Sequence, residues 1–363
     1  MKTYRLAIYP GDGIGTEVTA EAVRVLRAVE RRLQRFTLDC TELPWGIVYW
    51  RKTGKVVPDD FLEMLRPHDA ILLGAVGWPA ELPDHLTLAP LVQIRQQFDQ
   101  YACVRPARLY PGVACPLTGK GPADVDLVVI RENSEGEYVN VGGRFHAGHP
   151  DESAVQTAVH TRRGVERVLR FGFELARSRR RRLTMITKSN AQRFAYVLWD
   201  ELLDELRGQY ADIETDKQHA DAAVMNFVRC PERFDVVVAS NLFGDLLTDL
   251  GGVISGGLGL APSSNLNPER RFPSMFEPVH GSAPDIAGQG IANPIAAILS
   301  AAMLLDWLGE SEGGRLIRAA VEWVLADGQT TPDLGGSLST TDVGRRVADL
   351  VEQQIPLPPG EVR

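Results

Sequence analysis

The stretch FDVVVASNLFGDLLTD, residues 234–249, decides the fold class of this chain. Its first half, 234–240, is a short run of β-branched apolar residues that predicts a buried strand, and a helical pattern follows at once. Outward from it, similar short runs alternate with longer helical patterns, which predicts an α/β protein. The other predicted strands are 6–9, 70–73, 126–130 and 183–187, and the predicted helices are 17–33, 165–178, 191–206 and 295–305.

Length and composition restrict the possibilities. At 363 residues the chain exceeds the usual size of a single core, so two domains are expected. A net charge of −8 disfavours nucleic acid as a partner. Four scattered cysteines indicate reduced thiols, typical of the cytoplasm. No apolar segment follows Met1 as in a signal peptide, and the apolar run at 295–305 is too short to span a membrane, so we expect a soluble cytoplasmic protein.

Two other segments permit a functional and a plain interpretation. Pro10-Gly-Asp-Gly-Ile-Gly15 follows the first strand, but its G-x-G-x-G spacing is not the dinucleotide fingerprint. We therefore favour a turn that needs positive φ angles. The basic run at 177–182 is predicted to be a solvated turn between a helix and a strand rather than an anion site.

Two carboxylates in the helix after the clearest strand suggest a metal site. Asp245 and Asp249 are four residues apart, so they lie on one face of that helix and repel each other. A divalent cation would remove the repulsion, and oxygen ligands suit Mg²⁺ or Mn²⁺. The alternative is two exposed acids at a helix start, which the apolar neighbours make less attractive. Asp221 is a third candidate ligand that spacing alone supports only weakly.

Taken together, these motifs resemble the β-decarboxylating dehydrogenases, which include isocitrate, isopropylmalate, homoisocitrate, tartrate and D-malate dehydrogenases. The resemblance runs from the glycine loop at 11–15 to Thr331-Pro-Asp-Leu-Gly-Gly336, and residues 277–286 with 291–294 look like the adenosine-binding loop of the NAD-using members. The segments closest to the tartrate/D-malate branch are 74–79, 83–85, 98–101, 131–138, 187–190 and 264–270.

The resemblance implies an isopropylmalate/isocitrate dehydrogenase-like fold, not a Rossmann fold. Residues 1–102 and 256–363 would form a large α/β domain with both termini and the NAD site. Residues 103–255 would form a small inserted domain with the catalytic Lys and Asp residues and the dimer interface. The active site would lie in the cleft between them, and the glycine loop would be a cleft loop. Family members are homodimers, or dimers of dimers, whose active sites are shared between subunits.

The resemblance also assigns chemical roles. Asp245 and Asp249, with Asp221 from the partner subunit, would hold Mg²⁺ or Mn²⁺. Lys188, also from the partner, would be the general base, and Tyr138 would donate the proton at C3. The substrate-binding residues would be Arg95, Arg105 and Arg131, whose planar guanidinium groups suit a carboxylate.

For the cofactor, Asp285 is the informative residue, because a carboxylate binds the ribose diol and repels a 2′-phosphate, which favours NAD over NADP. K⁺ is a candidate activator. The remaining residues predicted at the NAD site are Glu277, His280, Gly281, Ser282, Ala283, Ile286 and Asn293.

The chain departs from its branch at Leu86-Thr-Leu-Ala-Pro-Leu-Val92, where Ala-Pro replaces the usual Trp-Gly. This apolar segment disfavours isocitrate, whose third carboxylate needs a polar partner. The leading hypothesis is NAD-dependent oxidative decarboxylation of D-malate or tartrate, and the alternative within the class is 3-isopropylmalate or another alkylmalate. A non-catalytic regulatory subunit and metal-dependent phosphoryl transfer are hypotheses from other classes. The retained site residues disfavour the first, and the lack of a Walker-type loop disfavours the second.

Overall fold

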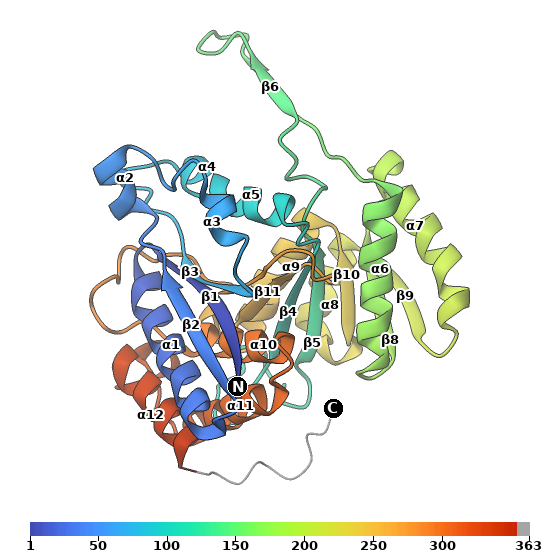
Figure 1. Ribbon diagram of the computed structural model, residues 1–363. Helices are drawn as coiled ribbons and strands as arrows, with labels where there is room; N and C mark the ends of the chain where they lie inside the picture. The colour runs from blue at the N-terminus through green and yellow to red at the C-terminus, as the bar shows by residue number, and fades with distance from the viewer. Residues whose placement is uncertain (354–363) are drawn as a thin grey trace.

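One sheet of ten strands runs through the molecule and confirms the α/β fold class (Figure 1). The structure is a computed structural model, and it describes residues 1–353. In spatial order the strands are β2 (Phe36–Glu42), β1 (Lys2–Gly11), β3 (Ala70–Ala75), β12 (Ser274–Pro278), β11 (Pro262–Leu266), β4 (Ala102–Arg108), β5 (Asp126–Glu132), β10 (Val236–Ala239), β8 (Arg182–Thr187) and β9 (Glu214–His219).

The middle of the sheet is antiparallel, and both flanks are parallel. β11 pairs antiparallel with β12 and β4, and β4 pairs antiparallel with β5, whereas the other neighbours are parallel. The strands from β2 to β11 come from the two segments predicted to form the large domain, 1–102 and 256–363. Those from β4 to β9 come almost entirely from 103–255. The domain boundaries stay a prediction, because the sheet is continuous across them.

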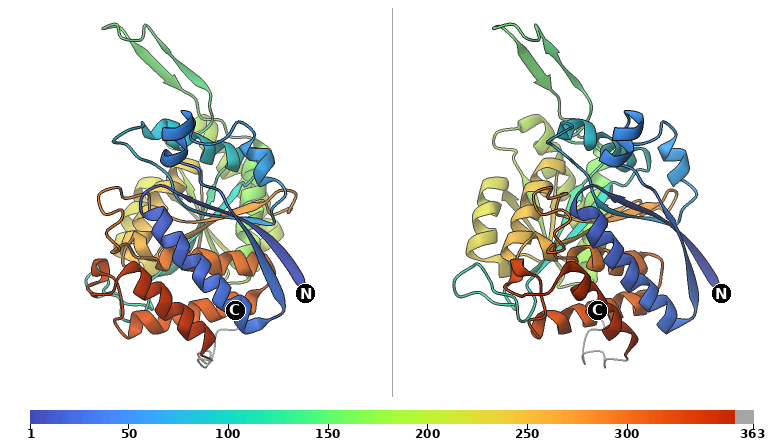
Figure 2. Two further views of the ribbon diagram at one scale, coloured as in Figure 1. Left: turned by 60° about the vertical axis from the view of Figure 1, so that its left-hand side comes forward. Right: turned by 90° about the vertical axis from the view of Figure 1, so that its left-hand side faces the viewer.

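Helices cover both faces of each flank (Figures 1 and 2). On the β2–β11 flank, long helices lie on one face and short helices on the other. On the other flank two pairs of helices enclose the sheet. The long helices of the β2–β11 flank are α1 (Ile14–Leu33), α10 (Ile295–Trp307), α11 (Ser311–Ala326) and α12 (Thr340–Glu352), and the short helices on its other face are α2 (Ile47–Thr53), α3 (Phe61–Leu65), α4 (Asp84–Thr87) and α5 (Ala89–Gln97). On the other flank, α6 (Arg162–Arg177) and α7 (Arg193–Arg207) cover one face, and α8 (Ala220–Arg229) and α9 (Asn241–Ile254) cover the opposite face.

Strand β10 is covered by helices on both faces, which explains why its sequence is apolar at every position. Val236 and Val238 pack into the core beneath α6 and α7, whereas Val237 and Ala239 pack into the core beneath α8 and α9. Alternate side chains of a strand point to opposite faces, so a strand covered on both faces has no solvent-facing position. The predicted strand at 234–240 is confirmed, and so are the other predicted strands and helices, with ends shifted by a few residues.

The basic run at 177–182 lies between α6 and β8, as predicted, but it is more than a solvated turn. Arg179 pairs with Asp126 and with the buried carboxylate of Asp235, at 2.9 and 2.8 Å. The main-chain N–H of Arg180 also donates to Asp235, at 2.8 Å. A buried charge needs such partners, so these arginines fix the start of β8.

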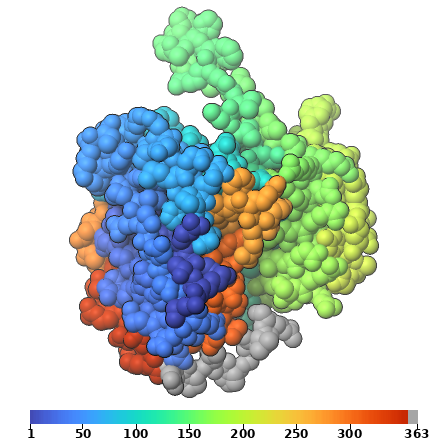
Figure 3. Space-filling model, in the orientation of Figure 1, coloured from blue at the N-terminus to red at the C-terminus, as the bar shows by residue number. Residues whose placement is uncertain are grey.

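A two-stranded hairpin projects from the body of the molecule (Figures 1, 2 and 3). It consists of β6 (Gly142–Phe145) and β7 (Ser153–Gln156), and all eight of these residues are exposed. The sequence analysis did not predict it. An isolated hairpin is marginally stable in water, and this one carries exposed apolar side chains at Phe145 and Val155.

Two further predictions concern the chain as a whole. The four cysteines are free, as expected. Among the described residues, no helix is long and apolar enough to cross a membrane.

Candidate active site

Asp245 of α9, itself partly exposed, lies at the centre of a cluster that includes two buried arginines. Its Oδ1 accepts hydrogen bonds from Nη1 of Arg105, at 3.1 Å, and from Nη1 of Arg131. Its Oδ2 accepts a hydrogen bond from the Tyr138 hydroxyl at 2.9 Å. The Arg131 guanidinium also lies 5.0 Å from the centre of the Tyr138 ring. The structure therefore brings together a predicted metal ligand, two predicted substrate-binding arginines and the predicted proton donor.

The pairing of β4 with β5 explains why the two arginines meet. Arg131 lies opposite Cys103, which is two residues from Arg105, so both arginines point to the same face of the sheet. That face is the one covered by α9, whose first turn follows β10 at Asn241. Nε of Arg131 donates to the Asn241 side-chain oxygen at 2.9 Å, and Arg105 donates to the Thr248 hydroxyl at 2.7 Å. Hydrogen bonds at Asn241 and Thr248 thereby join the first two turns of α9 to the two arginines.

The third predicted arginine, Arg95, is buried on α5 and makes a different contact. Its Nη2 donates to Oε1 of Glu277 at 2.6 Å, and the same oxygen accepts a hydrogen bond from Asn265 at 2.7 Å. Glu277 was predicted at the NAD site. Its carboxylate, on β12, pairs with Arg95, a predicted substrate-binding residue, and its role at the NAD site stays a prediction.

The charges of this cluster set its ionisation. Burial opposes ionisation of Asp245, but Arg131 and then Arg105 outweigh it and hold the pKa of Asp245 below its ordinary value. Burial lowers the pKa of Arg131 to about 10, which leaves it charged at neutral pH. Burial and then the charge of Asp245 raise the pKa of Asp249. Two cationic guanidinium groups and an ionised carboxylate thus meet at Asp245 at neutral pH.

Asp249 fits the predicted cation site. It lies on the same face of α9 as Asp245. Within residues 1–353 its carboxylate has no hydrogen bond or ion pair, and burial together with the charge of Asp245 raises its pKa despite the opposing effect of Arg105 and Arg131. However, no group of three His, Cys, Asp or Glu side chains in the described part of the chain could hold a metal. One chain therefore supplies two of the three predicted ligands at this position.

The third predicted ligand, Asp221, lies in a separate pair with Lys188. Nζ of Lys188 donates to Oδ1 of Asp221 at 2.9 Å, and this contact lowers the pKa of Asp221. The side chain of Asp221, at the start of α8, is 64% exposed. Among residues 1–353, no hydrogen bond or ion pair joins either residue to Asp245 or Asp249. This chain does not bring the predicted base and third ligand into the Asp245 cluster.

The turn that carries Lys188 is nevertheless well defined. Asp200 of α7 accepts hydrogen bonds from the hydroxyls of Thr187 and Ser189, at 2.7 and 2.8 Å, and from Nζ of Lys217 at 2.8 Å. These contacts fix the residues on both sides of Lys188 at the end of β8. The position of the lysine is therefore set by the fold and not by a flexible loop.

The glycine loop at 11–15 is a close-packed turn, as the sequence favoured. Gly11 and Gly13 have φ angles of 73° and 56°. A Cβ on Gly13 would collide with the main-chain oxygen of Ser282, which already accepts a hydrogen bond from the N–H of Ile14 at 2.8 Å. Asp12 fixes the turn by accepting hydrogen bonds from two main-chain N–H groups. The loop contacts the segment predicted to bind adenosine.

That segment, 280–293, offers groups for a ligand. Nε2 of His280 is buried and has no hydrogen-bond partner within the described residues, and burial lowers the pKa of this histidine. The side chain of Asp285 is exposed. Asn293 is partly committed, because its amide contacts Asp333 and the N–H of Ile295, each at 3.0 Å. Gly281 has open space around it, whereas Ala283 and Ile286 pack against the core.

Comparisons with known proteins identify the family of this chain. The family model for isocitrate/isopropylmalate dehydrogenase matches residues 5–347. The chain belongs to this family. The resemblance predicted from the motifs, including the tartrate/D-malate branch, is confirmed. Family membership makes the chain a decarboxylating oxidoreductase.

Individual relatives cover almost the full chain. D-malate dehydrogenase [decarboxylating] of Escherichia coli (strain K12) is 51% identical, over 97% of this chain and 99% of that protein. Tartrate dehydrogenase/decarboxylase of Pseudomonas putida is 48% identical, over 96% and 97%. 3-Isopropylmalate dehydrogenase of Thermobifida fusca (strain YX) is 49% identical, over 97% and 99%. The crystal structure of isocitrate dehydrogenase from Methylococcus capsulatus matches with a TM-score of 0.87 and 35% identity, over 96% of this chain and all of that one. The isocitrate dehydrogenase-like fold, distinct from a Rossmann fold, is thereby confirmed.

Several residues around this family member's arginines were missed by the sequence analysis. They are Asn241, Thr248, Ser263 and Asn265, which hydrogen-bond to the arginines or to Glu277. Each is a buried polar residue inside an apolar helix or a central strand. Buried polar groups need partners, so their positions in otherwise apolar elements were the available signal.

Proposed function

We propose that the chain catalyses NAD-dependent, divalent-metal-dependent oxidative decarboxylation of D-malate or tartrate. The observation that carries the proposal is the partly buried Asp245 carboxylate, shared by Arg105, Arg131 and Tyr138 beside Asp249, which has no ion pair within residues 1–353. Relatives named for D-malate and tartrate, at 51 and 48% identity, support the choice of substrate.

The residues of the cluster match the needs of a 2-hydroxy dicarboxylic acid. Arg95, Arg105 and Arg131 supply forked donors for its carboxylates. Asp245 and Asp249 would hold Mg²⁺ or Mn²⁺, which supplies a Lewis acid for the charge on the C2 oxygen, while bound NAD⁺ supplies the hydride acceptor. Tyr138 then delivers a proton to C3 after the carboxylate on that carbon has left as CO₂.

We further propose that Lys188 and Asp221 serve the active site of a partner in a homodimer, or a dimer of dimers. Lys188 would take the C2 hydroxyl proton there, and Asp221 would be the third metal ligand. An exposed apolar strip on α8 and α9, next to Asp221 and Asp245, supports this. Its residues are Val224, Met225, Val228, Leu246 and Val253, each at least 44% exposed. The projecting β6–β7 hairpin offers a second contact.

For the cofactor we propose NAD, bound along the segment 280–293. The exposed Asp285 carboxylate would accept the hydroxyls of the adenosine ribose and repel a 2′-phosphate. The unpartnered Nε2 of His280 is a polar group available to the same ligand. Replacing Asp285 by Ser should narrow the preference for NAD over NADP and leave metal binding intact, as measured by kcat/KM with each cofactor.

We also propose that the active site lies in a cleft between two domains, with boundaries near residues 102 and 255. The free cysteines support a cytoplasmic location.

The main alternative is 3-isopropylmalate or another alkylmalate. Two observations favour it as a second candidate. Leu86 and Leu88, on the apolar segment leading to Arg95, are 46 and 39% exposed, and a relative named for 3-isopropylmalate is 49% identical. An apolar substituent on C3 would suit such side chains.

A substrate panel tests the proposal. NADH formation would be measured with D-malate, L- and meso-tartrate, 3-isopropylmalate, isocitrate and homoisocitrate, with Mn²⁺ or Mg²⁺ and with or without K⁺. We expect the highest kcat/KM with D-malate or tartrate and none after metal removal by a chelator. A clear preference for 3-isopropylmalate would establish the alternative. No turnover of any substrate by the chain purified alone would instead favour a regulatory subunit.

A further inference from the structure

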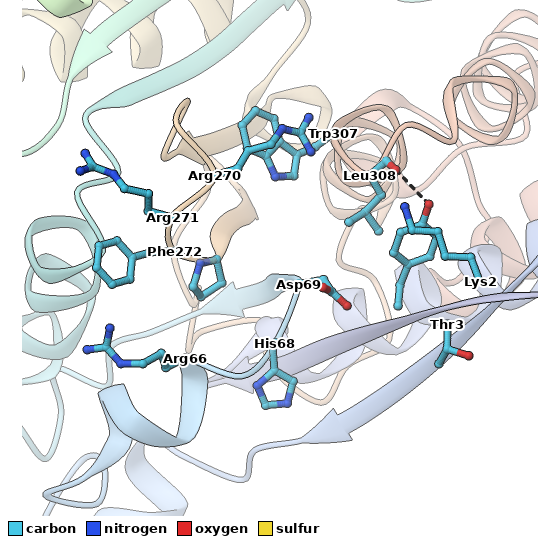
Figure 4. Close-up of a pocket in the computed structure, with 12 residues that line it drawn as sticks. Lys2, Thr3, Arg66, His68, Asp69, Arg270, Arg271, Phe272, Trp307 and Leu308 are labelled. Carbon is cyan, nitrogen blue, oxygen red and sulfur yellow. Dashed lines mark hydrogen bonds between the residues drawn. The ribbon is translucent and has the colours of Figure 1, made fainter.

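A cavity lined by cationic side chains lies beside the start of β1 and residues 270–273 (Figure 4). Its volume is about 260 Å³. Lys2, Arg66, Arg270 and Arg271 contribute four cations to its lining, whereas Asp69 is the only carboxylate among the described residues that line it. This concentration of positive charge stands out in a chain of net charge −8. An acidic protein gains a local cationic cavity only when basic residues from several elements converge.

The cations come from three separate parts of the chain. Lys2 begins β1, Arg66 follows α3, and the other two lie in the β11–β12 loop at 267–273. Within residues 1–353, neither Lys2 nor Arg270 forms an ion pair. Arg66 pairs with Glu63 at 3.2 Å and Arg271 with Asp99 at 3.7 Å, and both arginines are largely exposed in these pairs. Exposed pairs contribute little free energy, so a bound anion can compete for them.

The β11–β12 loop has a definite conformation that presents its two arginines. The side-chain oxygen of Asn267 accepts hydrogen bonds from the N–H groups of Arg271 and Phe272, at 2.7 and 3.2 Å. Arg270 has a φ of 54°, in the left-handed region that residues other than glycine rarely adopt. Its guanidinium lies 3.9 Å from the centre of the Trp307 ring. The loop therefore holds Arg270 in an unfavourable conformation at the cavity, where no carboxylate of residues 1–353 pairs with it.

The cavity is distinct from the active site. Lys2 and Ser274 stand at the amino ends of the parallel strands β1 and β12, next to the cavity. Ser263 and Glu277, which contact the substrate-binding arginines, face each other at the end of the β11–β12 pair that is farther from the cavity. The length of the β11–β12 strand pair thus separates the cavity from the substrate-binding arginines. A ligand in the cavity therefore cannot be the substrate bound between Arg105 and Arg131.

We propose that this cavity binds a compact polyanion, a small molecule with two or more phosphate or carboxylate groups. The cavity is slightly smaller than typical sites for drug-sized ligands. Separate cations at its edges suit several negative groups on a short framework better than a single charge. The aromatic faces of Trp307 and Phe272 hold the guanidinium groups of Arg270 and Arg66 in place, at 3.9 and 5.1 Å from their ring centres. The proposal is independent of the identity of the substrate.

Binding would be measured by titration calorimetry on the full chain with pyrophosphate, ATP and citrate, each in metal-free buffer. Three probes distinguish an inorganic or nucleotide phosphate from a carboxylate. We expect saturable binding of at least one probe, weakened by added salt. We also expect its dissociation constant to rise at least about tenfold in the double variant Arg270→Asn/Arg271→Gln, since charge-assisted contacts are lost. Asn tolerates the left-handed conformation, so the loop is expected to keep its shape.

A double variant with the same loss of charge elsewhere, Arg207→Gln/Arg345→Gln, is the matched control and should bind like the wild type. Lys2→Met, on a different element, should also weaken binding and guards against a folding defect of the loop variant. A change in Trp fluorescence on binding, absent in Trp307→Phe, would locate the ligand beside Arg270. Absence of saturable binding by all three probes would overturn the proposal. Equal binding by the cavity and control variants would overturn it too.

Discussion

The Asp245 cluster and the Lys188–Asp221 pair are both made of predicted catalytic residues, yet they differ in almost every physical respect. In the first, buried guanidinium groups surround one carboxylate, and each has a second partner. In the second, a single contact of 2.9 Å joins a lysine to a carboxylate that is 64% exposed. The contacts of the first group all lie within one chain, and the second group is oriented by its chain without being enclosed by it.

This difference suggests how the two groups are used. A buried charge network keeps its geometry without a ligand, because each charge is already satisfied. An exposed ion pair contributes little to stability, so Lys188 and Asp221 can exchange their mutual contact for new partners at small cost. We infer that the first group is the fixed half of the active site and the second the half that is completed on assembly.

The largest expected effect comes from the centre of the fixed half. Asp245→Asn keeps the shape of the side chain but removes the charge shared by the arginines and the proposed metal. We expect turnover to fall below detection while NAD binding, measured by calorimetry, stays nearly normal. Asp204→Asn, at an exposed position on α7, is the control. Near-normal turnover by Asp245→Asn would show that the metal assignment is wrong.

The next largest loss of turnover is expected from a change at Lys188. Lys188→Met removes the proposed base, and loss of a general base typically lowers kcat by about 10²–10⁴-fold. Substrate and metal binding should persist, because neither depends on that amine. Lys217→Met, which removes the neighbouring amine that pairs with Asp200, tests whether local structure alone explains the loss. An equal loss of kcat in both variants would contradict a chemical role for Lys188.

The smallest effect concerns the support of the arginines. Thr248→Val preserves shape but removes the hydroxyl that accepts a hydrogen bond from Arg105 at 2.7 Å. A hydrogen bond to a charged group contributes about 1.5–3 kcal/mol. We expect the KM for substrate to rise about tenfold with kcat nearly unchanged, which steady-state kinetics would measure. A selective loss of kcat would mean that Thr248 acts in the chemical step.

The fixed half shows how far sequence can lead. The spacing of Asp245 and Asp249 placed them on one helix face, and the apolar run before them predicted the strand that leads into it. The contacts of Arg105 with Thr248 and of Arg95 with Glu277 could not be predicted from periodicity, because they join residues 143 and 182 positions apart. Such contacts depend on the register of β4 with β5 and on the crossing of α5 over β12.

The roles of Lys188 and Asp221 could not be predicted from the spacing of residues in one chain. Nothing in the spacing of Lys188 and Asp221 indicates whether they act in their own site or a partner's, and only the family resemblance suggested the latter. The β6–β7 hairpin was missed because its residues, rich in Gly and His, show no regular apolar alternation. Its exposure became evident only from the fold.

A hybrid dimer tests the divided active site most directly. Asp245→Asn and Lys188→Met chains carrying different affinity tags would be co-expressed, and dimers containing both tags isolated in two steps. Each parent dimer is expected to retain little or no activity. In a twofold dimer with shared sites, one hybrid site carries both defects and the other carries none, so the hybrid should have about half of the wild-type activity. A hybrid as inactive as its parents would contradict the account.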